Sequence, residues 1–600
     1  MISTKGALSL LEPLRPSFWF GPIFDKELRV TARRRRHYVL RMVYGLLLMV
    51  MTVSVWVQVV PRISPDEWTT SRMAEAGKAI VTLLAWFQFI GLQLVTVVTM
   101  SSAISEEITR RTLSTLMTTP ITSVQIVLGK LFSRLLQVML LYAMSWPLLA
   151  MVRVFGGVPW NYLLSTACMT LALVWFLSSL TLLYSVFFKR AYTVMIFAVM
   201  TAGVLFGLVP LLLMYVIEAS PSLRGQPALL TIGRSTLATI CPYLGFWCQT
   251  QAMQTTGVPG WSFSWPVHCI LMLSLSVPLL WLACVKVRKA ALRHLVARTS
   301  RKEYKIPKNV GRREILYRPL FLHNWIRRRW GTGMVWKEFL VPVLGRFRFV
   351  VYVAAGALFG VFGIGLTLAI FLERLELLGF LFALLIFSFL LLAILFTLVV
   401  PATCITSEKE ARCWSILLTT RMSHGQILGG KLAGVLRRIV LAWSPFCVIF
   451  GLVAYTAGMA LPLVIQLSGV GIISVGFLVA VGLYLSTRFQ RSTPAVVTGL
   501  TLLGIIWGLV PLMATVLQAF SYQWSWVRHS IRSWHMVETI MNATPVGMIV
   551  TLLNYPSRNV WQLGNARSAL VFHASLYVAL YGGGALFLLW RAKANIARHA

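Results

Sequence analysis

Two charged segments, far apart in the chain, carry side chains of the same kinds at similar spacing. In the first, a serine precedes two carboxylates and two arginines, and a Thr-Pro pair follows. A serine at such a position can cap a helix, and carboxylates in the first turn lie near the positive end of the helix dipole. The pattern predicts a short surface helix that is capped by Ser105 and ended by Pro120. The candidate binding residues of this copy are Ser105, Glu106, Glu107, Arg110, Arg111, Thr119 and Pro120.

The second copy aligns Ser407-Glu408 with Ser105-Glu106, and Arg421 stands where the first copy has Pro120. Each copy is followed by a Gly-Lys pair, Gly129-Lys130 in the first and Gly430-Lys431 in the second. A single segment of this kind would be explained by a solvated loop, whereas two matching segments favour a shared function. The candidate residues of the second copy are Ser407, Glu408, Glu410, Arg412 and Thr420.

The second Gly-Lys pair has the spacing of a phosphate-binding loop up to its last position. That position holds a Ser or Thr that binds Mg²⁺ in such loops, and the loop follows a strand. Here Leu432 occupies the position, and the sequence before Gly425 does not predict a strand. We therefore expect no ATP site and no cofactor in this chain.

The other reactive side chains form no pattern that a catalytic or metal site requires. The eight cysteines include no C-x-x-C pair, and no H-E-x-x-H or G-x-S-x-G motif stands beside an apolar run. Acidic residues fall in loops or near the ends of apolar runs, whereas ion-coupled transporters place them inside their spans. We expect no catalytic residue, no metal site and no enzyme activity.

The elements that position the charged segments are membrane-spanning helices. Hydrophobic residues make up 58% of the 600 residues and charged residues 12%, about half the charged share of a soluble domain. About twelve apolar runs are long enough to span a bilayer, which predicts an all-α polytopic membrane protein. The predicted spans are 39–60, 79–103, 135–152, 161–186, 193–217, 266–285, 349–371, 378–403, 437–458, 463–487, 494–519 and 569–590.

This topology also explains the net charge of +38. With the N-terminus inside, most Lys and Arg residues fall in cytoplasmic segments, as the positive-inside rule requires. The lipid bilayer is thus an expected partner, and nucleic acid is not. We expect a multi-pass protein of the bacterial plasma (inner) membrane with both termini in the cytoplasm.

The chain consists of two related halves. Gly207-Leu208-Val209-Pro210-Leu211 recurs as Gly508-Leu509-Val510-Pro511-Leu512, at an offset of 301 residues. Because each half has an even number of spans, both enter the membrane in the same orientation, and two parallel six-helix repeats are predicted. The expected order is a cytoplasmic segment with an interfacial helix, the first half, a basic linker with a second interfacial helix, the second half and a tail. Their bounds are 1–38, 39–285, 286–348, 349–590 and 591–600.

Polar side chains follow one face of the second span. Two interpretations carry equal weight: hydrogen bonding between helices, and the lining of a path through the membrane. A proline in the fifth span of each half removes one helical hydrogen bond and gives that helix a bending point. The path candidates are Gln88, Gln93, Thr96, Thr99, Pro210 and Pro511.

These repeated features resemble the ABC-2 type transporter permeases, the membrane subunits of a class of ATP-binding-cassette exporters. The resemblance covers both halves and implies two such permeases fused in one chain, with a type V exporter-like fold. In that family the segment between the second and third spans is a coupling helix seated on the ATPase, and the stretch before the first span is a connecting helix. The residues that carry the resemblance are Lys26-Glu27, Lys337-Glu338, the block from Glu106 to Lys130, Pro242 and Pro545.

The resemblance also implies partners and an energy source. ABC ATPase subunits, two per chain, would bind ATP and Mg²⁺ and contact the two charged segments. The leading hypothesis is an exporter permease that moves an amphiphilic or largely apolar substrate. The alternative is a non-transporting scaffold or accessory subunit of an ATPase-driven cell-envelope complex, which would show ATPase activity without substrate flux.

Overall fold

The computed structural model describes residues 23–30, 33, 35–59, 70–110, 112–113, 121–153, 157–188, 190–210, 213–214, 217, 227–254, 263–302, 333–340, 393–394, 396–456, 460–509, 539–554 and 564–598. These residues form helices and turns, with no strand among them. Six of the described helices are long and apolar enough to cross a membrane: Gly77–Ile108, Ser123–Arg153, Trp160–Phe187, Trp265–Lys289, Leu461–Arg488 and Val571–Ala597. The predicted all-α polytopic fold is confirmed, and the protein is an integral multi-pass membrane protein.

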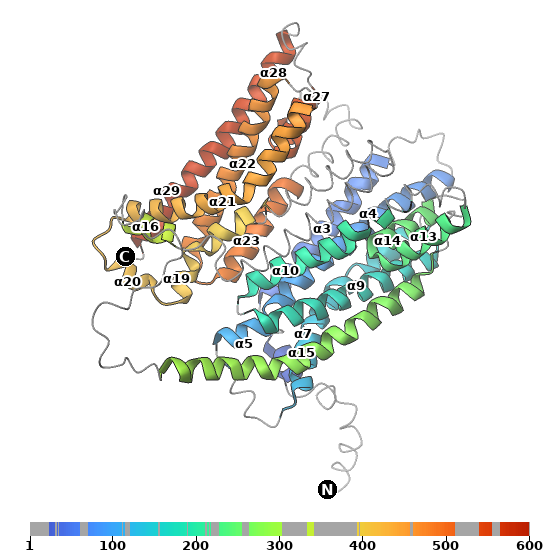
Figure 1. The fold of residues 1–600 in the computed structure, drawn as a ribbon. Helices are drawn as coiled ribbons and strands as arrows, with labels where there is room; N and C mark the ends of the chain where they lie inside the picture. Colours follow the sequence, from blue (N-terminus) through green and yellow to red (C-terminus); the bar gives the residue numbers. More distant parts are fainter. Residues whose placement is uncertain are drawn as a thin grey trace. The chain divides into compact units, whose positions relative to one another are not determined.

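The number of spans stays a prediction, because 349–371 and most of 378–403 lie outside the described residues. The chain divides into two units, Met1–Asn309 and Val310–Ala600. The helices of the first unit, after a short helix at 23–30, are α3 (Arg35–Val59), α4 (Thr70–Ser101), α5 (Ser105–Arg110), α7 (Ser123–Ala143), α8 (Trp146–Arg153), α9 (Trp160–Phe187), α10 (Ala191–Gly203), η4 (Val204–Leu208), α13 (Pro227–Ile240), α14 (Pro242–Gln254) and α15 (Trp265–Lys302) (Figure 1).

Helix α9 forms the centre of the first unit. It packs against α4, α15, α10 and α14, and most of its side chains are buried. Small hydroxyl residues recur along it, and Thr166, Ser178 and Thr181 each donate to a carbonyl four residues earlier. Because these hydroxyl groups are satisfied within the helix, neighbouring helices can pack closely on α9 without leaving a polar atom unpaired.

The segment before the sixth span of the first half forms two short helices. Helices α13 and α14 meet at Cys241, and α14 packs against α4 and α9. Phe246 of α14 stacks on Phe89 of α4 with ring centroids 4.2 Å apart, and Trp86 meets Phe246 edge-on. These aromatic contacts fasten α14 to the second span.

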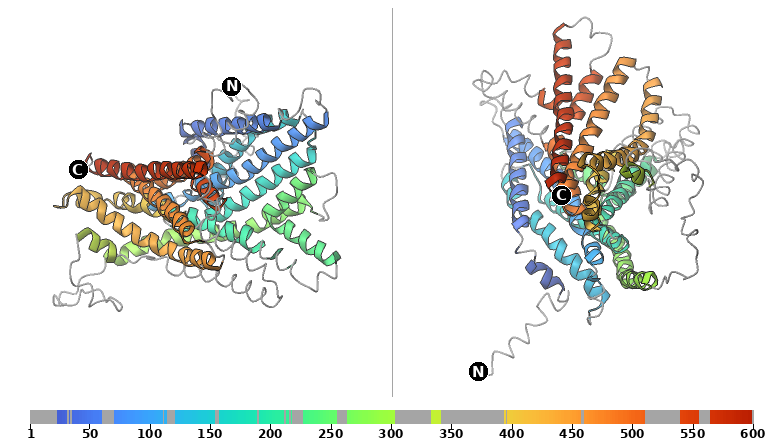
Figure 2. Two further views of the ribbon diagram at one scale, coloured as in Figure 1. Left: turned by 90° about the horizontal axis from the view of Figure 1, so that it is seen from above. Right: turned by 90° about the vertical axis from the view of Figure 1, so that its left-hand side faces the viewer.

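The second unit contains α16 (Gly333–Leu340), α19 (Thr406–Glu410), α20 (Trp414–Leu418), α21 (His424–Thr456), α22 (Leu461–Arg488), α23 (Ser492–Gly504), η6 (Ile505–Leu509), α27 (Pro545–Asn554), α28 (Gly564–Tyr577), η7 (Val578–Gly583) and α29 (Gly584–Arg598). Helix α22 takes the place that α9 has in the first unit and packs against α29, α23 and α27 (Figure 2). The hydroxyl groups of Ser474 and Tyr577 lie 2.5 Å apart and join α22 to the sixth span.

The fifth span of each half changes from an α-helix to a π-helical turn at equivalent residues. The π-helical turns η4 and η6 begin at Val204 and Ile505, which are related by the offset of 301. Pro210 has no N–H to donate to the carbonyl of Phe206, and the thiol of Cys241 donates to that oxygen instead, at 3.2 Å. The region around Pro210 therefore contains a widened turn held by a thiol from the α13–α14 junction, and Pro511 lies outside the described residues.

The third spans begin earlier than the apolar runs predict. Helix α7 begins at Ser123 and α21 at His424, against predicted starts of 135 and 437. Each has a capping box, formed by Thr122 with Gln125 and by Ser423 with Gln426. The predicted starts were wrong because the first turns of both helices are polar, and the Gly-Lys pairs consequently lie on helices and not in loops. The start of the 286–348 linker is also helical, since α15 continues to Lys302.

Candidate functional site

A lysine bound to two carboxylates joins three elements of the first half. The Nζ atom of Lys130, on α7, lies 3.2 Å from Oε1 of Glu27 and 3.0 Å from Oε1 of Glu107. Glu27 belongs to the helix at 23–30 and Glu107 to α5, and Arg134 lies 4.0 Å from the second oxygen of Glu27. Lys130 is almost fully buried. This ion cluster links the helix before the first span, the turn after the second and the start of the third.

The second half builds the same cluster from the equivalent elements. Nζ of Lys431, on α21, lies 2.5 Å from Oε1 of Glu338 and 2.7 Å from Oε1 of Glu408. Glu338 belongs to α16 and Glu408 to α19. Arg438 and Lys337 add ion pairs to Glu338 and Glu408, at 3.2 and 3.1 Å. The second cluster is thus the more heavily charged of the two.

The contacts correct the alignment of the two charged segments. The sequence pairs Glu106 with Glu408, whereas the residue that binds the Gly-Lys lysine in the first half is Glu107. Glu107 and Glu408 are separated by the same 301 residues as Lys130 and Lys431. Because a serine stands directly before the first carboxylate of each segment, the sequence alignment of the two segments was shifted by one residue.

The glycine of the second Gly-Lys pair allows two helices to cross closely. A Cβ atom at Gly430 would lie 2.7 Å from Cγ of Met334, and one at Gly434 would lie 2.7 Å from Cβ of Glu338. Both neighbours belong to α16, so a side chain at either glycine would push α16 away from α21. The two glycines therefore bring Glu338 within reach of Lys431.

Electrostatics keep the Lys431 ammonium group charged although it is buried. Burial alone opposes the charge, but the carboxylates of Glu338 and Glu408 more than offset that effect and raise the pKa of Lys431 above its usual value. Removing one partner of such a buried pair leaves an uncompensated charge, which typically costs about 3–5 kcal/mol. The ion pairs of the cluster therefore hold α16, α19 and α21 together.

The first copy of the predicted binding segment is described only in part. The hydroxyl of Ser105 donates to the carbonyl of Ser101 at 2.8 Å, and its role as the cap of α5 stays a prediction. The chain enters α5 from a turn whose carbonyls accept from the N–H groups of Glu106 and Ile108. The remaining predicted residues are Arg110, which ends α5, and Arg111, Thr119 and Pro120, which lie outside the described residues.

The second copy forms two short helices and not the continuous helix that the sequence predicts. Arg412, between α19 and α20, has φ of 57°, a left-handed conformation that non-glycine residues seldom adopt. Ser407 donates to the carbonyl of Cys404 and Thr420 to that of Leu417. Glu410 accepts from the backbone and hydroxyl of Ser492. The predicted carboxylates of this copy therefore all bind within the chain.

Beyond the carboxylates, α20 ends in an exposed surface. Trp414 is buried against Ile427 of α21 and Ile596 of α29, which fixes the helix, whereas Ile416 is 67% exposed. We define the tip surface as the exposed residues at this end: Ser415, Ile416, Thr419, Thr420 and Arg421. The predicted connecting-helix residue Lys26 is likewise exposed, beside the first cluster.

The predicted path residues of α4 make hydrogen bonds within the first unit. Gln88 accepts from the hydroxyl of Ser145 at 3.2 Å, and Gln93 accepts from the hydroxyl of Tyr243 at 2.6 Å. Thr96 and Thr99 donate to carbonyls of their own helix. These contacts agree with the interpretation of the stripe as hydrogen bonding between helices, and they do not test whether it lines a path.

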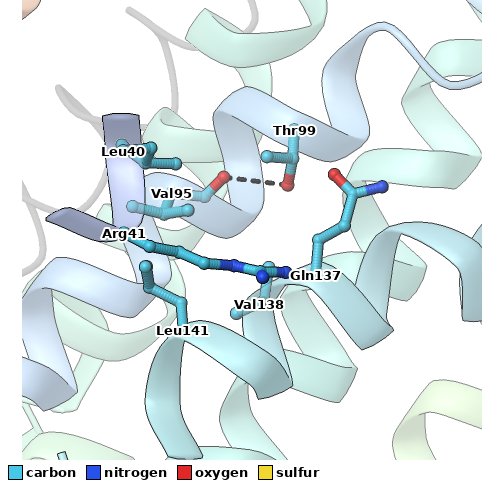
Figure 3. A pocket seen from close by; sticks show the side chains of 7 residues that line it. All are labelled: Leu40, Arg41, Val95, Thr99, Gln137, Val138 and Leu141. Carbon is cyan, nitrogen blue, oxygen red and sulfur yellow. Dashed lines mark hydrogen bonds between the residues drawn. The ribbon is translucent and has the colours of Figure 1, made fainter. Parts of the chain in front are cut away.

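A small cavity lies between α3, α4 and α7 (Figure 3). Its volume of about 20 Å³ is enough for a single water. Arg41, Thr99 and Gln137 are its polar lining residues, and its apolar wall is formed by Leu40, Val95, Val138 and Leu141. The cavity is far too small to hold an organic substrate.

One matching pair of residues was missed by the sequence analysis. His268 and His573, each in a sixth span, bind the helical segment that precedes that span. Nδ1 of His268 lies 2.7 Å from the carbonyl of Thr239, and Nδ1 of His573 lies 3.3 Å from Nδ2 of Asn542. Thr239 and Asn542 each precede the repeated proline, Pro242 or Pro545, by three residues. The sequence shows this relation only after the two prolines are aligned.

Comparison with known proteins gives one match. Residues 22–256 match the model of a family described as "ABC-2 family transporter protein". The matched segment begins just before the helix at 23–30 and ends just after α14, so it includes the first ion cluster. No curated protein and no solved structure matches the chain.

Proposed function

We propose that the whole chain is an exporter permease made of two ABC-2 type halves, because residues 22–256 match the family of ABC-2 transporter proteins, membrane components of ATP-binding-cassette transporters. Separate ATPase subunits, two per chain, would supply the energy by binding and hydrolysing ATP. The sequence repeat and the second ion cluster support the same role for the second half.

The duplicated ion cluster is the observation that carries this proposal. In each half it ties the short helix after the second span to the start of the third span and to the helix before the first. A force applied to the short helix therefore moves all three elements together, since breaking the buried pairs costs several kcal/mol. A partner that pushes on this helix in each ATP cycle would displace the half as a body.

The structure changes which residues we propose to bind the ATPase. Glu107 and Glu408 are held by the lysines of their clusters, so the contact in the second half is assigned to the tip surface, with Ile416 at its centre. An apolar side chain surrounded by polar ones is the arrangement of a protein–protein hot spot. The corresponding surface of the first half would be formed by 111–120.

A variant at Ile416 tests the ATPase contact. Ile416→Asp should lower the amount of ATPase that co-purifies with the chain by about half, because the first half keeps its own contact, whereas Ile416→Val, which keeps the apolar contact, should preserve it. Insertion and stability of both variants are followed by thermal unfolding in detergent, because an exposed residue should not affect the fold. If Ile416→Asp binds the ATPase normally, the tip surface is not part of the interface.

The proposed substrate is an amphiphile or a largely apolar molecule. The predicted spans 79–103, 193–217, 378–403 and 494–519 contain no charged residue, and a small ion moving beside them would have no counter-charge. In proteoliposomes with the ATPase bound, a fluorescent short-chain phospholipid should move between leaflets when ATP is added. Vesicles without ATP, and vesicles with a hydrolysis-deficient ATPase, are the controls.

The alternative function, a non-transporting scaffold, is favoured by one observation. The polar stripe of α4 makes hydrogen bonds inside the first unit, and the cavity between α3, α4 and α7 has room for about one water. A scaffold would stimulate ATP hydrolysis and leave the phospholipid probe and a panel of amphiphilic dyes untransported. ATP-dependent movement of any of them would exclude the scaffold.

We also propose that both termini lie in the cytoplasm, together with the 286–348 linker, as the distribution of Lys and Arg indicates. Cysteines introduced one at a time at Gln226 and Lys302, in a background without other cysteines, should react with an impermeant reagent from opposite sides of the membrane. Reaction from the same side would overturn the proposed span count.

A further inference from the structure

Lys409, the residue after the cluster carboxylate of the second half, binds the end of another span. Its ammonium group donates to the carbonyls of Ser486, Thr487 and Phe489, at 3.2, 2.5 and 3.2 Å. These carbonyls belong to the last turn of α22 and the residue after it, where the carbonyl groups have no helical partner. A cation at this end also complements the negative end of the helix dipole.

Glu410, the next residue, binds the start of the following helix. Its Oε1 atom accepts from the backbone N–H and the hydroxyl of Ser492, both at 2.7 Å. Ser492 is the first residue of α23, and its N–H group lies at the positive end of that helix. Two adjacent side chains of α19 thus hold both sides of the turn between the fourth and fifth spans.

The first half has different residue types at the positions of this pair. At the offset of 301 that relates Glu107 to Glu408, Ile108 stands for Lys409 and Thr109 for Glu410. Ile108 is buried and apolar. The start of α10 is bonded locally, since the hydroxyl and the N–H of Thr193 both donate to the carbonyl of Arg190. Neither Ile108 nor Thr109 can bring a charge to the end of a helix.

We infer that Lys409 and Glu410 are positioning residues that connect the ATPase-contacting helices of the second half directly to its fifth span. This inference rests on the proposed function. A displacement of the tip surface passes through Lys409 and Glu410 to the α22–α23 turn, and α23 carries it to the widened turn η6. In the first half the displacement reaches the third span through Lys130, and Ile108 and Thr109 stand where Lys409 and Glu410 extend it to the fifth. The two halves therefore respond unequally to ATP.

The link itself is tested on the chain alone. The N–H of Ser492 has no helical acceptor, so its protection from hydrogen exchange depends on Glu410. Glu410→Ala should increase the exchange rate of the first amides of α23 by about tenfold or more. Glu410→Gln, which retains an accepting oxygen, should restore most of the protection. Unchanged exchange in Glu410→Ala would overturn the inference.

The coupling is tested on the complex with the co-purified ATPase. Hydrogen exchange is compared between the nucleotide-free complex and the complex trapped with ATP and vanadate. In the wild-type chain the trapped state should alter exchange in 492–504 more than in the equivalent 191–203. The double variant Lys409→Met with Glu410→Ala should lose the change in 492–504 and keep the change in 424–436, whereas Lys593→Met, a matched exposed lysine of α29, should keep both.

The outcomes separate the link from the proposed function. Equal responses of 492–504 and 191–203, or a full response in the double variant, would overturn the inference while leaving the permease proposal in place. Failure of the wild-type chain to bind any ATPase would reject the permease proposal, and the exchange of the isolated chain would still decide whether Glu410 holds α23. If the double variant unfolds, Glu410→Ala alone replaces it.

Discussion

Lys130 and Lys431 occupy matching positions 301 residues apart, and each donates to one carboxylate from the helix before the first span and to another from the helix after the second. Their surroundings differ in burial. The partners of Lys431, Glu338 and Glu408, are 6% and 16% exposed, whereas those of Lys130 are 20% and 24% exposed. Water screens the first cluster more than the second.

Loss of the lysine should therefore destabilise the second half more than the first. Lys431→Met removes the buried cation between Glu338 and Glu408 and leaves them only the more exposed Arg438 and Lys337, at a cost of about 3 kcal/mol, and Lys130→Met should cost less. Thermal unfolding of the two variants in the same detergent measures the difference. Adding Glu338→Gln and Glu408→Gln to Lys431→Met should restore part of the stability, and equal losses at the two lysines would contradict the role of burial.

The capping boxes of the third spans should each contribute measurable stability. Thr122→Ala removes the side-chain acceptor at the start of α7 and should cost about 1 kcal/mol, whereas Thr122→Ser, which keeps it, should cost little. Ser423→Ala should act likewise on α21. Thermal unfolding measures both, and a Thr122→Ala variant as stable as Thr122→Ser would show that the box is not formed.

The hydrogen bond between Gln93 and Tyr243 distinguishes packing from transport. A double-mutant cycle of Gln93→Leu with Tyr243→Phe should show a coupling energy of about 0.6 kcal/mol, the average for side-chain hydrogen bonds between membrane helices. If the stripe only joins helices, both single variants should lower stability and leave transport of the phospholipid probe proportional to folded protein. A stable Gln93→Leu variant that no longer transports the probe would indicate that Gln93 lines the transport path.

The stability of the second unit should depend on pH through Lys409. Burial lowers the pKa of Lys409 to about 8, below the value of about 10.4 for an exposed lysine. Between these two values the unfolded chain holds a proton that the folded chain has lost, so stability rises with pH across this window. The unfolding temperature of the wild type, measured relative to Lys409→Met, should therefore increase from pH 7.5 to pH 10. A constant difference would show that Lys409 does not titrate there.

The sequence predicted the spans and the repeat because both depend on local patterns. Apolar runs located α9 and α22 to within a few residues, and the Gly-Leu-Val-Pro-Leu motif predicted that the fifth spans are equivalent, as the paired turns η4 and η6 now show. The sequence also contains the capping-box patterns Thr122-x-x-Gln125 and Ser423-x-x-Gln426. Apolar runs do not reveal these helix starts, because the first turns are polar.

The ion clusters could not be predicted from local patterns. Glu27 and Lys130 are separated by 103 positions and meet only through the packing of α7 against the helix at 23–30. Charged residues near a membrane are expected to remain exposed, and burial of Glu338 follows from the close crossing at Gly430 and Gly434. The turn at Arg412 is equally unpredictable, since its residue type gives no sign of a left-handed backbone.

The difference at Lys409 and Glu410 also bears on why the two halves share one polypeptide. Two unlike permeases made as separate chains and associating at random would give three pairings, two of which join identical halves. A pair of first halves would have Ile108 and Thr109 in both copies in place of Lys409 and Glu410. Covalent fusion fixes the stoichiometry at one of each kind, so that every assembled molecule contains one half with the link and one without.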